Sequence, residues 1–467
     1  MINFGALLSN TSNFLYTYIL IALLIFAGLY FTVRTRGVQF RLFPEALRVL
    51  GEKKKDGKDI SSFQALMIST ASRVGTGNIA GVANAIIAAT VIGGYGAVFW
   101  MWLLALIGAA SAFIESTLAQ CYKEKHGDNW VGGPAYYIQK ALGSRFFGVV
   151  FAVLLIACFA YGFNALQAYN AGSALQYYLP GYSESVWPAV VGAALALLTG
   201  LCIFGGVRRI SAITSGIVPV MAAIYIALGL FITVKNIGQV PYMLSMIVSQ
   251  AFDPKAMFAG IGASCIMQGI KRGLYSNEAG MGSAAIPAAS AATDSPARQG
   301  YVNMTGVFFD TTVICTVTGL CICASGVLGT ADASGAQVNG VALTALAFKT
   351  VLGPLGGLLV SLGIVLFAFS TILGWEFCGE TAFAFLFGRR AIPLYRILFA
   401  LAAFLGATQS LEVVWNLSDI FNALMAVPNL ISLLLLSGTA ARELEAFQPE
   451  IRRGRRLRQR RAVRRAL

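Results

Sequence analysis

The chain has 467 residues, of which 57% are hydrophobic and only 12% are charged, and its mean hydropathy is +0.72. These values exclude a soluble globular protein. Because a membrane-spanning helix needs about 20 apolar residues, the chain has room for roughly eleven spans, and the fold class we predict is an all-α polytopic membrane protein. The formal net charge is +14, which on its own would also suit a nucleic-acid-binding protein.

The first elements are a leading transmembrane helix over residues 1–33 and a basic cytoplasmic segment over residues 34–60. The segment contains three consecutive lysines, Lys53, Lys54 and Lys55. Its FRLFPEALRVL portion is amphipathic, which is typical of a helix that lies along a membrane surface.

The next span, about residues 61–90, has a polar and glycine-rich centre. The run from Ser69 to Ala83 reads STASRVGTGNIAGVA, with Thr76 and Asn78 among its glycines. Each glycine weakens a helix by about 1 kcal/mol relative to alanine, so the cluster predicts a helix that breaks halfway across the bilayer. A helix broken at this depth is typical of a transporter site. The alternative is a continuous helix that packs closely through its small residues.

The second span, about residues 96–120, follows a turn and begins within the run GGYGAVFWMW from Gly93 to Trp102. This run resembles the signature of the alanine or glycine:cation symporter family, the sodium:alanine symporters. Further matching motifs follow in the expected order, and the resemblance covers residues 61 to about 436. The matching runs are GGPAYYIQKALG (132–143), TSGIVPVMA (214–222), QGIKRGLYSNEAGMGSA (268–284) and FAFSTILGWEFCGE (367–380). One departure is MGSAA at residues 281–285, where Leu-Gly-Ser-Ala-Pro is expected.

A second glycine-rich polar interruption occurs in the span at about residues 256–286. Here Gly260, Gly262, Gly269, Gly273, Gly280 and Gly282 surround Lys271, Arg272, Ser276, Asn277 and Glu278. Paired interruptions in two halves of a chain indicate a transporter binding site. We therefore predict two inverted five-helix repeats, residues 61–235 and 256–437, followed by a basic cytoplasmic tail, 438–467. The resemblance implies the same 5+5 arrangement of the leucine-transporter type.

The predicted substrate-binding residues lie at these interruptions. The amino ends of half-helices offer free N–H groups to a carboxylate, which makes Thr76, Gly77 and Asn78 the candidates in the first interrupted helix. We add Gly269 from the second interrupted helix. The resemblance implies that Gln167 and Trp375 complete the pocket, whereas the plain alternative for both is hydrogen bonding between helices.

A sodium site is implied beside the same break. The resemblance places Ser370 and Thr371 as hydroxyl ligands, with Val74 and Gly77 as donors of backbone carbonyl oxygens. The alternative is that both hydroxyls donate to carbonyls of their own helix.

Several charged residues fall within the predicted spans, where they are costly and often functional. The acids are Glu115, Glu278, Asp310 and Glu380, and the bases are Arg73, Lys271 and Arg272. We expect most of them to pair with one another in the cytoplasmic half and to hold the inward path. A proton relay through one carboxylate is the alternative.

The distribution of basic residues predicts the orientation. Of the 34 Lys and Arg residues, Lys235, Lys255 and Lys349 fall on one side, Arg73, Lys271 and Arg272 fall within spans, and the others share the opposite side. Basic residues stay on the cytoplasmic side, so we expect the N-terminus outside and the C-terminus in the cytoplasm. The basic tail would then contact anionic headgroups of a bacterial inner membrane rather than nucleic acid.

These features predict a secondary transporter that imports a small neutral amino acid, alanine or glycine, with sodium by alternating access. We expect it to act as a monomer. Coupling to protons, or another substrate such as glutamine or serine, remains an alternative. A channel would need a continuous polar pore, and an enzyme is disfavoured because the chain has a single His and no evident nucleophile–base pair.

Overall fold

A computed structural model describes residues 4–50, 60–89, 94–127, 129–176, 178–179, 181–258, 264–331, 335 and 337–466 of the chain. The three lysines of the basic segment, Gly260 and Gly262 lie outside the described residues, as do Gly93 and the side chains from residue 449 onward. Within the described residues, eight helical stretches are long and apolar enough to cross a membrane. They are Gly5–Arg34, Gly96–Cys121, Arg145–Gln176, Gly206–Lys235, Pro296–Ser325, Pro354–Phe387, Arg389–Ala407 and Leu411–Gln448.

The first half of the chain contains the leading helix, a surface segment and the first interrupted helix. Its elements are α1 (Phe4–Phe14), η1 (Leu15–Leu20), α2 (Ile21–Arg34), α3 (Val38–Arg41), α4 (Phe43–Leu50), α5 (Ser62–Arg73), η2 (Thr76–Asn78), α6 (Ala80–Ala88), α7 (Gly96–Cys121), β1 (Glu124–His126), β2 (Asn129–Val131), α8 (Pro134–Ala141), α9 (Arg145–Ile156), η3 (Ala157–Phe163), α10 (Asn164–Gln176), η4 (Tyr182–Glu184), α11 (Trp187–Ile203) and α12 (Gly206–Lys235). Strands β1 and β2 form a short antiparallel hairpin, which the all-helical prediction did not include.

The second half of the chain also contains one interrupted helix between continuous helices. Its elements are η5 (Ile237–Gln239), α13 (Val240–Ala251), α14 (Pro254–Phe258), α15 (Cys265–Asn277), α16 (Ala285–Ser290), α17 (Pro296–Val307), η6 (Phe308–Cys315), α18 (Thr316–Ser325), α19 (Gly340–Leu352), α20 (Pro354–Phe387), η7 (Arg389–Ala391), α21 (Ile392–Ala407) and α22 (Leu411–Ala466). Segments η1, η3 and η6 are π-helical turns inside longer helices.

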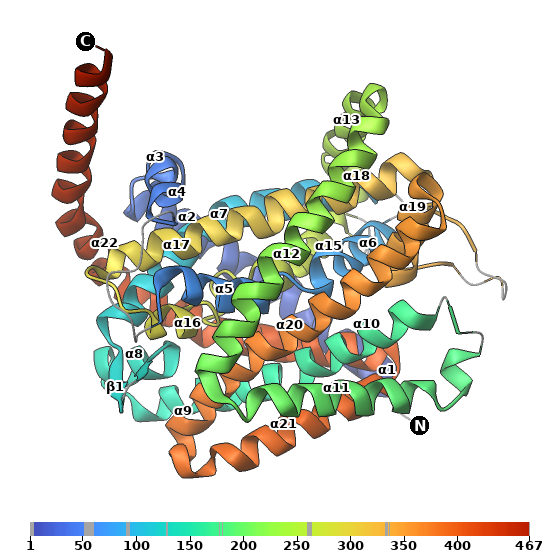
Figure 1. The fold of residues 1–467 in the computed structure, drawn as a ribbon, viewed down its shortest axis with the longest axis horizontal. Coiled ribbons are helices and arrows are strands. Elements are labelled where there is room, and N and C mark those ends of the chain that lie inside the picture. The colour runs from blue at the N-terminus through green and yellow to red at the C-terminus, as the bar shows by residue number, and fades with distance from the viewer. Residues whose placement is uncertain are drawn as a thin grey trace.

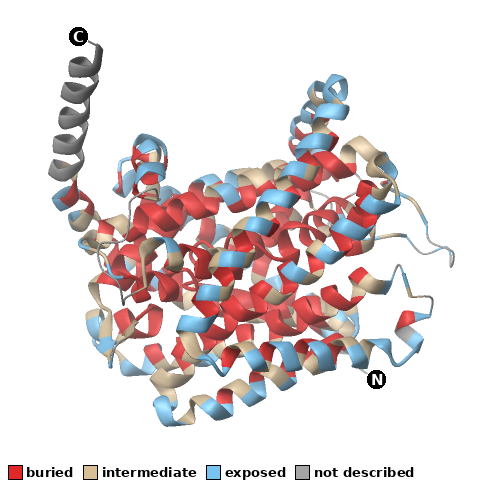
Figure 2. Ribbon diagram, viewed as in Figure 1, coloured by how far each residue is buried: buried red, intermediate tan, exposed pale blue. Residues whose placement is uncertain are grey.

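The two interrupted helices lie inside the bundle, between continuous helices. Helix α7 packs against α15, α16 and α17, and α20 packs against α5, α10 and α12. Figure 1 shows these long helices running side by side, with the interrupted α5–α6 and α15 among them. In Figure 2 the buried residues concentrate around the same inner helices, whereas α11, α12 and α21 are exposed along their outer faces.

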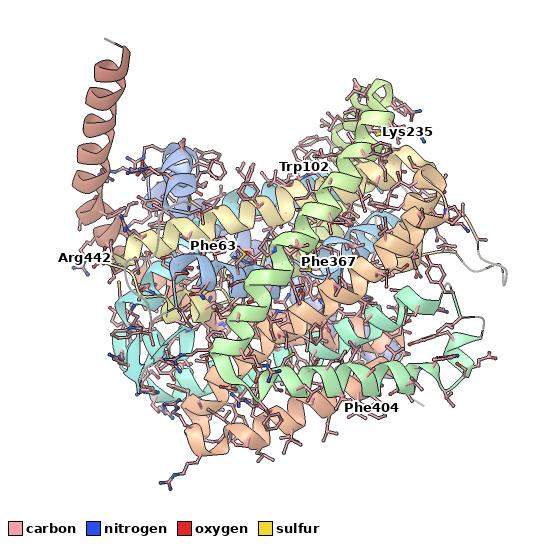
Figure 3. The ribbon with its side chains drawn as sticks, viewed as in Figure 1. Phe63, Trp102, Lys235, Phe367, Phe404 and Arg442 are labelled. Atoms are coloured by element: carbon pink, nitrogen blue, oxygen red, sulfur yellow. The ribbon has the colours of Figure 1, made fainter. Side chains whose placement is uncertain are left out.

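The outer faces of the bundle are apolar. Their exposed large side chains include Leu197 and Leu201 on α11, Phe231 on α12, and Leu398 and Leu401 on α21. An exposed apolar surface of this extent indicates contact with lipid. Figure 3 places Lys235 and Arg442 at opposite ends of the bundle, and Figure 1 places the two chain termini at opposite ends as well.

The break in the second interrupted helix lies later than the sequence suggested. Helix α15 continues through Gly269, Gly273 and Asn277, and the chain leaves the helix only at Glu278, whose φ of 53° is left-handed. Of the glycines expected at this interruption, Gly280 and Gly282 lie at the break, with φ of 85° and 93°, whereas Gly269 and Gly273 lie within the helix. A Cβ on Gly269 would stand 2.4 Å from the carbonyl oxygen of Ala97, so this glycine serves close packing against α7.

Candidate functional site

The first interrupted helix is broken where its glycine cluster predicted. Helix α5 ends at Arg73, Gly75 is extended (φ −133°, ψ −157°), and one 3₁₀ turn leads into α6. The Asn78 side chain stabilises the break, because its Oδ1 accepts a hydrogen bond from the Gly75 N–H at 3.1 Å. The alternative of a continuous, closely packed helix is therefore wrong.

Glycine is required at position 75 because two other helices meet the backbone there. A Cβ on Gly75 would stand 2.5 Å from Thr371 Oγ1 on α20 and 2.9 Å from Gln167 Nε2 on α10. The break is thus the point where α5–α6, α10 and α20 come together.

Gln167 contacts both interrupted helices. Its Oε1 accepts a hydrogen bond from the Thr76 N–H, and its Nε2 donates to the Tyr275 hydroxyl on α15, both at 3.3 Å. Asn170 Nδ2, one turn further along α10, donates to Thr76 Oγ1 at 2.7 Å. A Cβ on Gly77 would stand 2.5 Å from the Tyr275 ring. The structure therefore brings Thr76, Gly77 and Gln167 together.

Asn170 and Tyr275 belong to this group, although the sequence analysis did not name them. The signal for Asn170 was available, because it lies three residues after Gln167 and so faces the same side of the helix. Tyr275 carries no such signal, since an aromatic residue beside a polar run is equally compatible with ordinary packing.

Trp375 lies at the second break rather than the first. Its Nε1 donates to Glu278 Oε1 at 2.6 Å, while Glu278 Oε2 accepts from Ser72 Oγ of α5 at 3.3 Å. The Trp375 ring lies 4.8 Å from the ring of Phe163 and 6.2 Å from that of Tyr275, measured between centroids. Trp375 therefore covers one side of the cluster formed by Thr76, Gly77 and Gln167 with an aromatic ring. It also holds Glu278, the residue at which α15 ends, through a hydrogen bond.

Gly269 is not brought to this group. It faces the Ala97 carbonyl and Trp100 of α7, two turns before the end of α15. The structure gives it a packing position between two helices and no contact with the broken backbone.

The predicted sodium ligands divide into two sets. Thr371 Oγ1 lies 3.3 Å from the Val74 carbonyl oxygen and 2.7 Å from the Phe367 carbonyl of its own helix. Ser370 Oγ instead donates to the Phe367 carbonyl oxygen at 3.0 Å and lies 3.7 Å from the Met221 sulfur. Val74 and Thr371 thus meet at the break and Ser370 points elsewhere. Hydroxyl and carbonyl oxygens are ligands that hard cations prefer.

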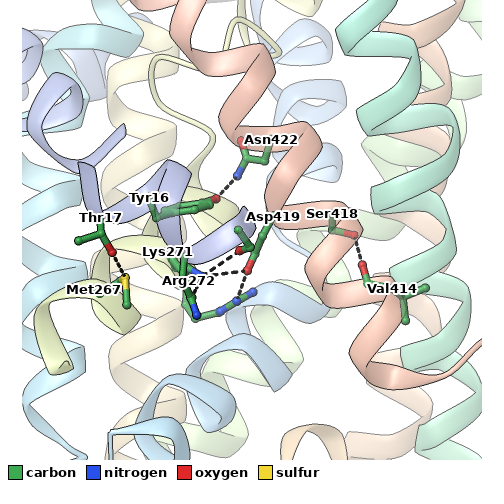
Figure 4. A network of polar contacts seen from close by, with 11 residues as sticks. Tyr16, Thr17, Met267, Lys271, Arg272, Val414, Ser418, Asp419 and Asn422 are labelled. Carbon is green, nitrogen blue, oxygen red and sulfur yellow. Dashed lines mark hydrogen bonds and ion pairs between the residues drawn. The ribbon is translucent and has the colours of Figure 1, made fainter. Parts of the chain in front are cut away.

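The expected pairing among the buried charges was wrong. Within the described residues, Lys271 Nζ and Arg272 Nη2 pair with Asp419 Oδ2 of α22, at 3.6 and 2.7 Å (Figure 4). Glu380 pairs with Arg396 of α21 at 2.7 Å. Asp419 and Arg396 lie on helices near the end of the chain, and the spacing of residues in the sequence does not predict such long-range contacts.

Arg73, Glu115 and Glu278 bond mainly to neutral groups, and Glu115 Oε1 has no hydrogen-bond partner. Arg73 donates to Ser69 Oγ at 2.8 Å and to Asn303 Oδ1 at 3.1 Å. Glu115 Oε2 accepts from the Gly282 N–H at 3.0 Å, so this acid holds the loop that follows the second break.

Comparison with known proteins supplies the context for this arrangement. The sequence pattern of the sodium:alanine symporter family matches residues 1–461. The sodium/alanine symporter AgcS of Methanococcus maripaludis is 42% identical over 97% of this chain and 98% of its own length. The amino-acid carrier protein AlsT of Bacillus subtilis is 41% identical over 97% of this chain and 94% of its own length. The probable sodium/glutamine symporter GlnT of the same organism is 39% identical over 95% and 90%.

Among solved structures, the crystal structure of MhsT in complex with L-phenylalanine is similar in fold. Its TM-score is 0.61, and the match covers 84% of this chain and 93% of that chain. The sequence identity is 16%, so the likeness concerns the fold alone.

Proposed function

Because the chain belongs to the sodium:alanine symporter family, as the motifs between Gly93 and Glu380 indicated, we propose that it imports alanine or glycine together with sodium. The family consists of membrane transporters and not enzymes, and sodium is its coupling ion. The observation that carries the proposal is the broken backbone at Val74–Asn78, which meets Gln167 and Thr371 from two other helices.

The two half-helices offer opposite partial charges to a zwitterion. Helix α6 begins just after the break and directs its positive amino end toward it, whereas α5 ends at the break and leaves carbonyl oxygens there. We assign the substrate carboxylate to the N–H groups of Thr76, Gly77 and Asn78. The Gln167 oxygen that now accepts from Thr76 would turn to the ammonium group.

The surroundings favour a small substrate. Phe163, Tyr275 and Trp375 form an aromatic wall, and the Tyr275 ring already touches Gly77. Alanine or glycine therefore fits the proposal best. A relative is named for glutamine, so glutamine remains the second candidate, and serine or coupling to protons the next ones.

We assign sodium to the oxygens of Val74 and Thr371, with the carbonyl of Gly77 and the Ser370 hydroxyl as further candidates. Moving one cation through about 100 mV supplies ~2.3 kcal/mol. That free energy supports roughly a 50-fold gradient of a neutral amino acid, so one sodium ion per substrate is sufficient.

The burial of the site supports transport by alternating access. Thr76, Gln167, Thr371 and Trp375 are all buried, so a substrate reaches them only if the surrounding helices move. We propose eleven spans, a leading helix followed by two inverted five-helix repeats, in which α5–α6 and α15–α16 are the first helices of each repeat. The similar fold of MhsT supports this arrangement.

We further propose a monomer in a bacterial inner membrane, with the N-terminus outside and the basic tail at cytoplasmic anionic headgroups. The opposite placement of the two termini and the charge distribution support that orientation.

The test is uptake of radiolabelled alanine by proteoliposomes that contain the purified protein. An inward sodium gradient is expected to drive accumulation above the equilibrium level, and an equal potassium gradient is not. Empty liposomes are the control. Accumulation that is independent of sodium, or equilibration at channel rates, would contradict the proposal. Competition by unlabelled glycine, serine and glutamine then ranks the substrates.

A further inference from the structure

A second cluster of oxygen atoms meets the broken helix, on residues that the proposed sodium site does not use. Asn78 Nδ2 donates to Ser276 Oγ at 2.9 Å and to the carboxylate of Asp310. Ser276 Oγ lies 3.0 Å from Thr311 Oγ1. The cluster therefore joins the first break, the end of α15 and the π-helical turn η6 through one carboxylate and two hydroxyls.

The carboxylate in this cluster is incompletely satisfied. Asp310 is 2% exposed, and while its Oδ1 accepts from Asn78, its Oδ2 has no hydrogen-bond partner. In the part of the chain that the structure describes, no basic group lies within 4.0 Å of Asp310. A buried, unpartnered carboxylate oxygen is costly in an apolar interior unless a cation compensates it.

Arg73 acts electrostatically on Asp310 but forms no ion pair with it within 4.0 Å. Arg73 interacts electrostatically with Asp310, Glu278 and Glu115, so three acids share one guanidinium group. The guanidinium nitrogens themselves donate to Ser69 and Asn303. The core around the break is therefore richer in acids than in bases.

We propose that Asp310 Oδ2, Ser276 Oγ and Thr311 Oγ1 bind a second sodium ion, so that two sodium ions accompany each amino acid. The inference rests on the proposed function, sodium symport. The ligands are a carboxylate and two hydroxyl oxygens, which suit a hard cation. The Cys315 sulfur lies 3.3 Å from Ser276 Oγ and is a neighbour of the cluster that we do not count among its ligands. The single positive charge would compensate the one carboxylate of this cluster, that of Asp310.

Asn78 explains how such an ion would be coupled to the substrate. Its amide accepts from the Gly75 N–H with Oδ1 and donates to Asp310 with Nδ2, so one side chain ties the shape of the break to the orientation of the carboxylate. It cannot coordinate the ion through a nitrogen that donates, and we regard it as a positioning residue. An ion at Asp310 therefore favours the backbone conformation to which the amino acid binds.

The experiment counts sodium ions on the purified full-length protein by equilibrium binding of ²²Na⁺, and measures the sodium dependence of alanine uptake in proteoliposomes. We expect two sodium ions per chain and a Hill coefficient near 2. With two sodium ions per substrate, the amino-acid gradient that about 100 mV can support rises from roughly 50-fold to roughly 2,500-fold.

The decisive variants are Asp310→Asn and Thr311→Val, compared with Thr312→Val as the matched control. Thr312 is the adjacent hydroxyl on the same π-helical turn, and it is only partly buried. We expect both test variants to bind one sodium ion with a Hill coefficient near 1, and Thr312→Val to retain two. Thr311→Val keeps the shape and the charge of the site, so it decides the question if Asp310→Asn fails to fold.

The outcomes separate this inference from the proposed function. One sodium ion per wild-type chain, or two in Thr311→Val, overturns the second site while sodium-driven uptake still supports symport. A pH dependence of uptake that Asp310→Asn removes, without loss of a sodium ion, assigns Asp310 to a proton and also overturns it. Uptake that ignores sodium altogether contradicts the proposed function itself.

Discussion

Single side chains decide what the broken backbone can bind, and neighbouring residues of the same type have different roles. Thr371 and Ser370 are adjacent hydroxyls on α20, yet only Thr371 reaches the Val74 carbonyl across the gap between helices. The family resemblance implied that both are sodium ligands, because the sequence shows two adjacent hydroxyls at the matching positions. The sequence does not show the rotation of α20 that separates them.

The first prediction compares these two hydroxyls. Thr371→Val removes the oxygen but keeps the shape, and we expect it to raise the sodium concentration for half-maximal uptake at least ~10-fold, the equivalent of about 1.4 kcal/mol. Ser370→Ala is expected to change it much less. The measurement is alanine uptake against sodium concentration at saturating alanine. Equal shifts in the two variants would show that both residues are ligands.

The second prediction concerns the size of the substrate. Trp375→Leu removes the aromatic wall beside Phe163, and larger neutral amino acids should then enter. Each methylene accommodated in an apolar pocket changes discrimination by about 1–3 kcal/mol. We expect valine and leucine to compete with labelled alanine at least ~10-fold better than in the parent protein.

Trp375→Phe separates the wall from the hydrogen bond. It keeps an aromatic ring but removes the N–H that donates to Glu278 Oε1. Selectivity for small substrates should persist in this variant while thermal stability falls. If leucine competes no better in Trp375→Leu than in Trp375→Phe, the size limit lies in another residue.

At the level of elements, the two breaks differ in how well the sequence predicts them. The first combines glycines with Thr76 and with Asn78, whose side chain accepts from the freed Gly75 N–H, and it was located correctly. In the second interrupted helix, Gly269 and Gly273 pack against α7 and the break comes only at Glu278. Glycine occurs both at helix breaks and at close contacts between helices, so only the contacts seen in the structure distinguish the two roles. The same limit hid Asp419, the partner of Lys271 and Arg272.

The third prediction tests the first break with two glycines of the same segment. In Gly75→Ala the added Cβ would stand 2.5 Å from Thr371 Oγ1, so either the backbone or α20 must shift. Overpacking of this kind costs about 1–3 kcal/mol, and we expect a lower melting temperature and loss of uptake.

Gly81→Ala is the matched control for that variant. Its Cβ would lie 3.9 Å from Arg272 Cδ, an ordinary contact on the helical half α6. Alanine is the better helix former, so this variant should be as stable as the parent or more stable. Thermal unfolding in detergent and alanine uptake provide both measurements, and normal uptake by Gly75→Ala would show that the close approach is not needed.

For the whole molecule, the apolar outer faces and the inner polar group are what composition predicts for a polytopic transporter. The sequence predicted an all-helical membrane protein and the place of the first break, because apolar length and glycine clusters are local properties. The small hairpin of β1 and β2 was missed, since its strands have only three residues each.

The fourth prediction concerns orientation. Lys255→Cys and Arg460→Cys place thiols at positions that we assign to opposite sides of the membrane. We expect an impermeant maleimide to label Lys255→Cys in intact cells, and Arg460→Cys only after the cells are permeabilised. The unmodified protein gives the background from its eight native cysteines. Labelling of Arg460→Cys from outside would reverse the orientation.

The three π-helical turns have a consequence for how the molecule moves. Each one contacts α15: Thr17 of η1 donates to the Met267 sulfur, Phe163 of η3 packs on Tyr275, and Thr311 of η6 lies against Ser276. A π-helical turn contains one residue more than the α-helical ladder needs, and that surplus can pass to the next turn by exchange of single hydrogen bonds. We therefore expect the three neighbours of α15 to be able to rotate their contacting side chains along it without any change in helix length.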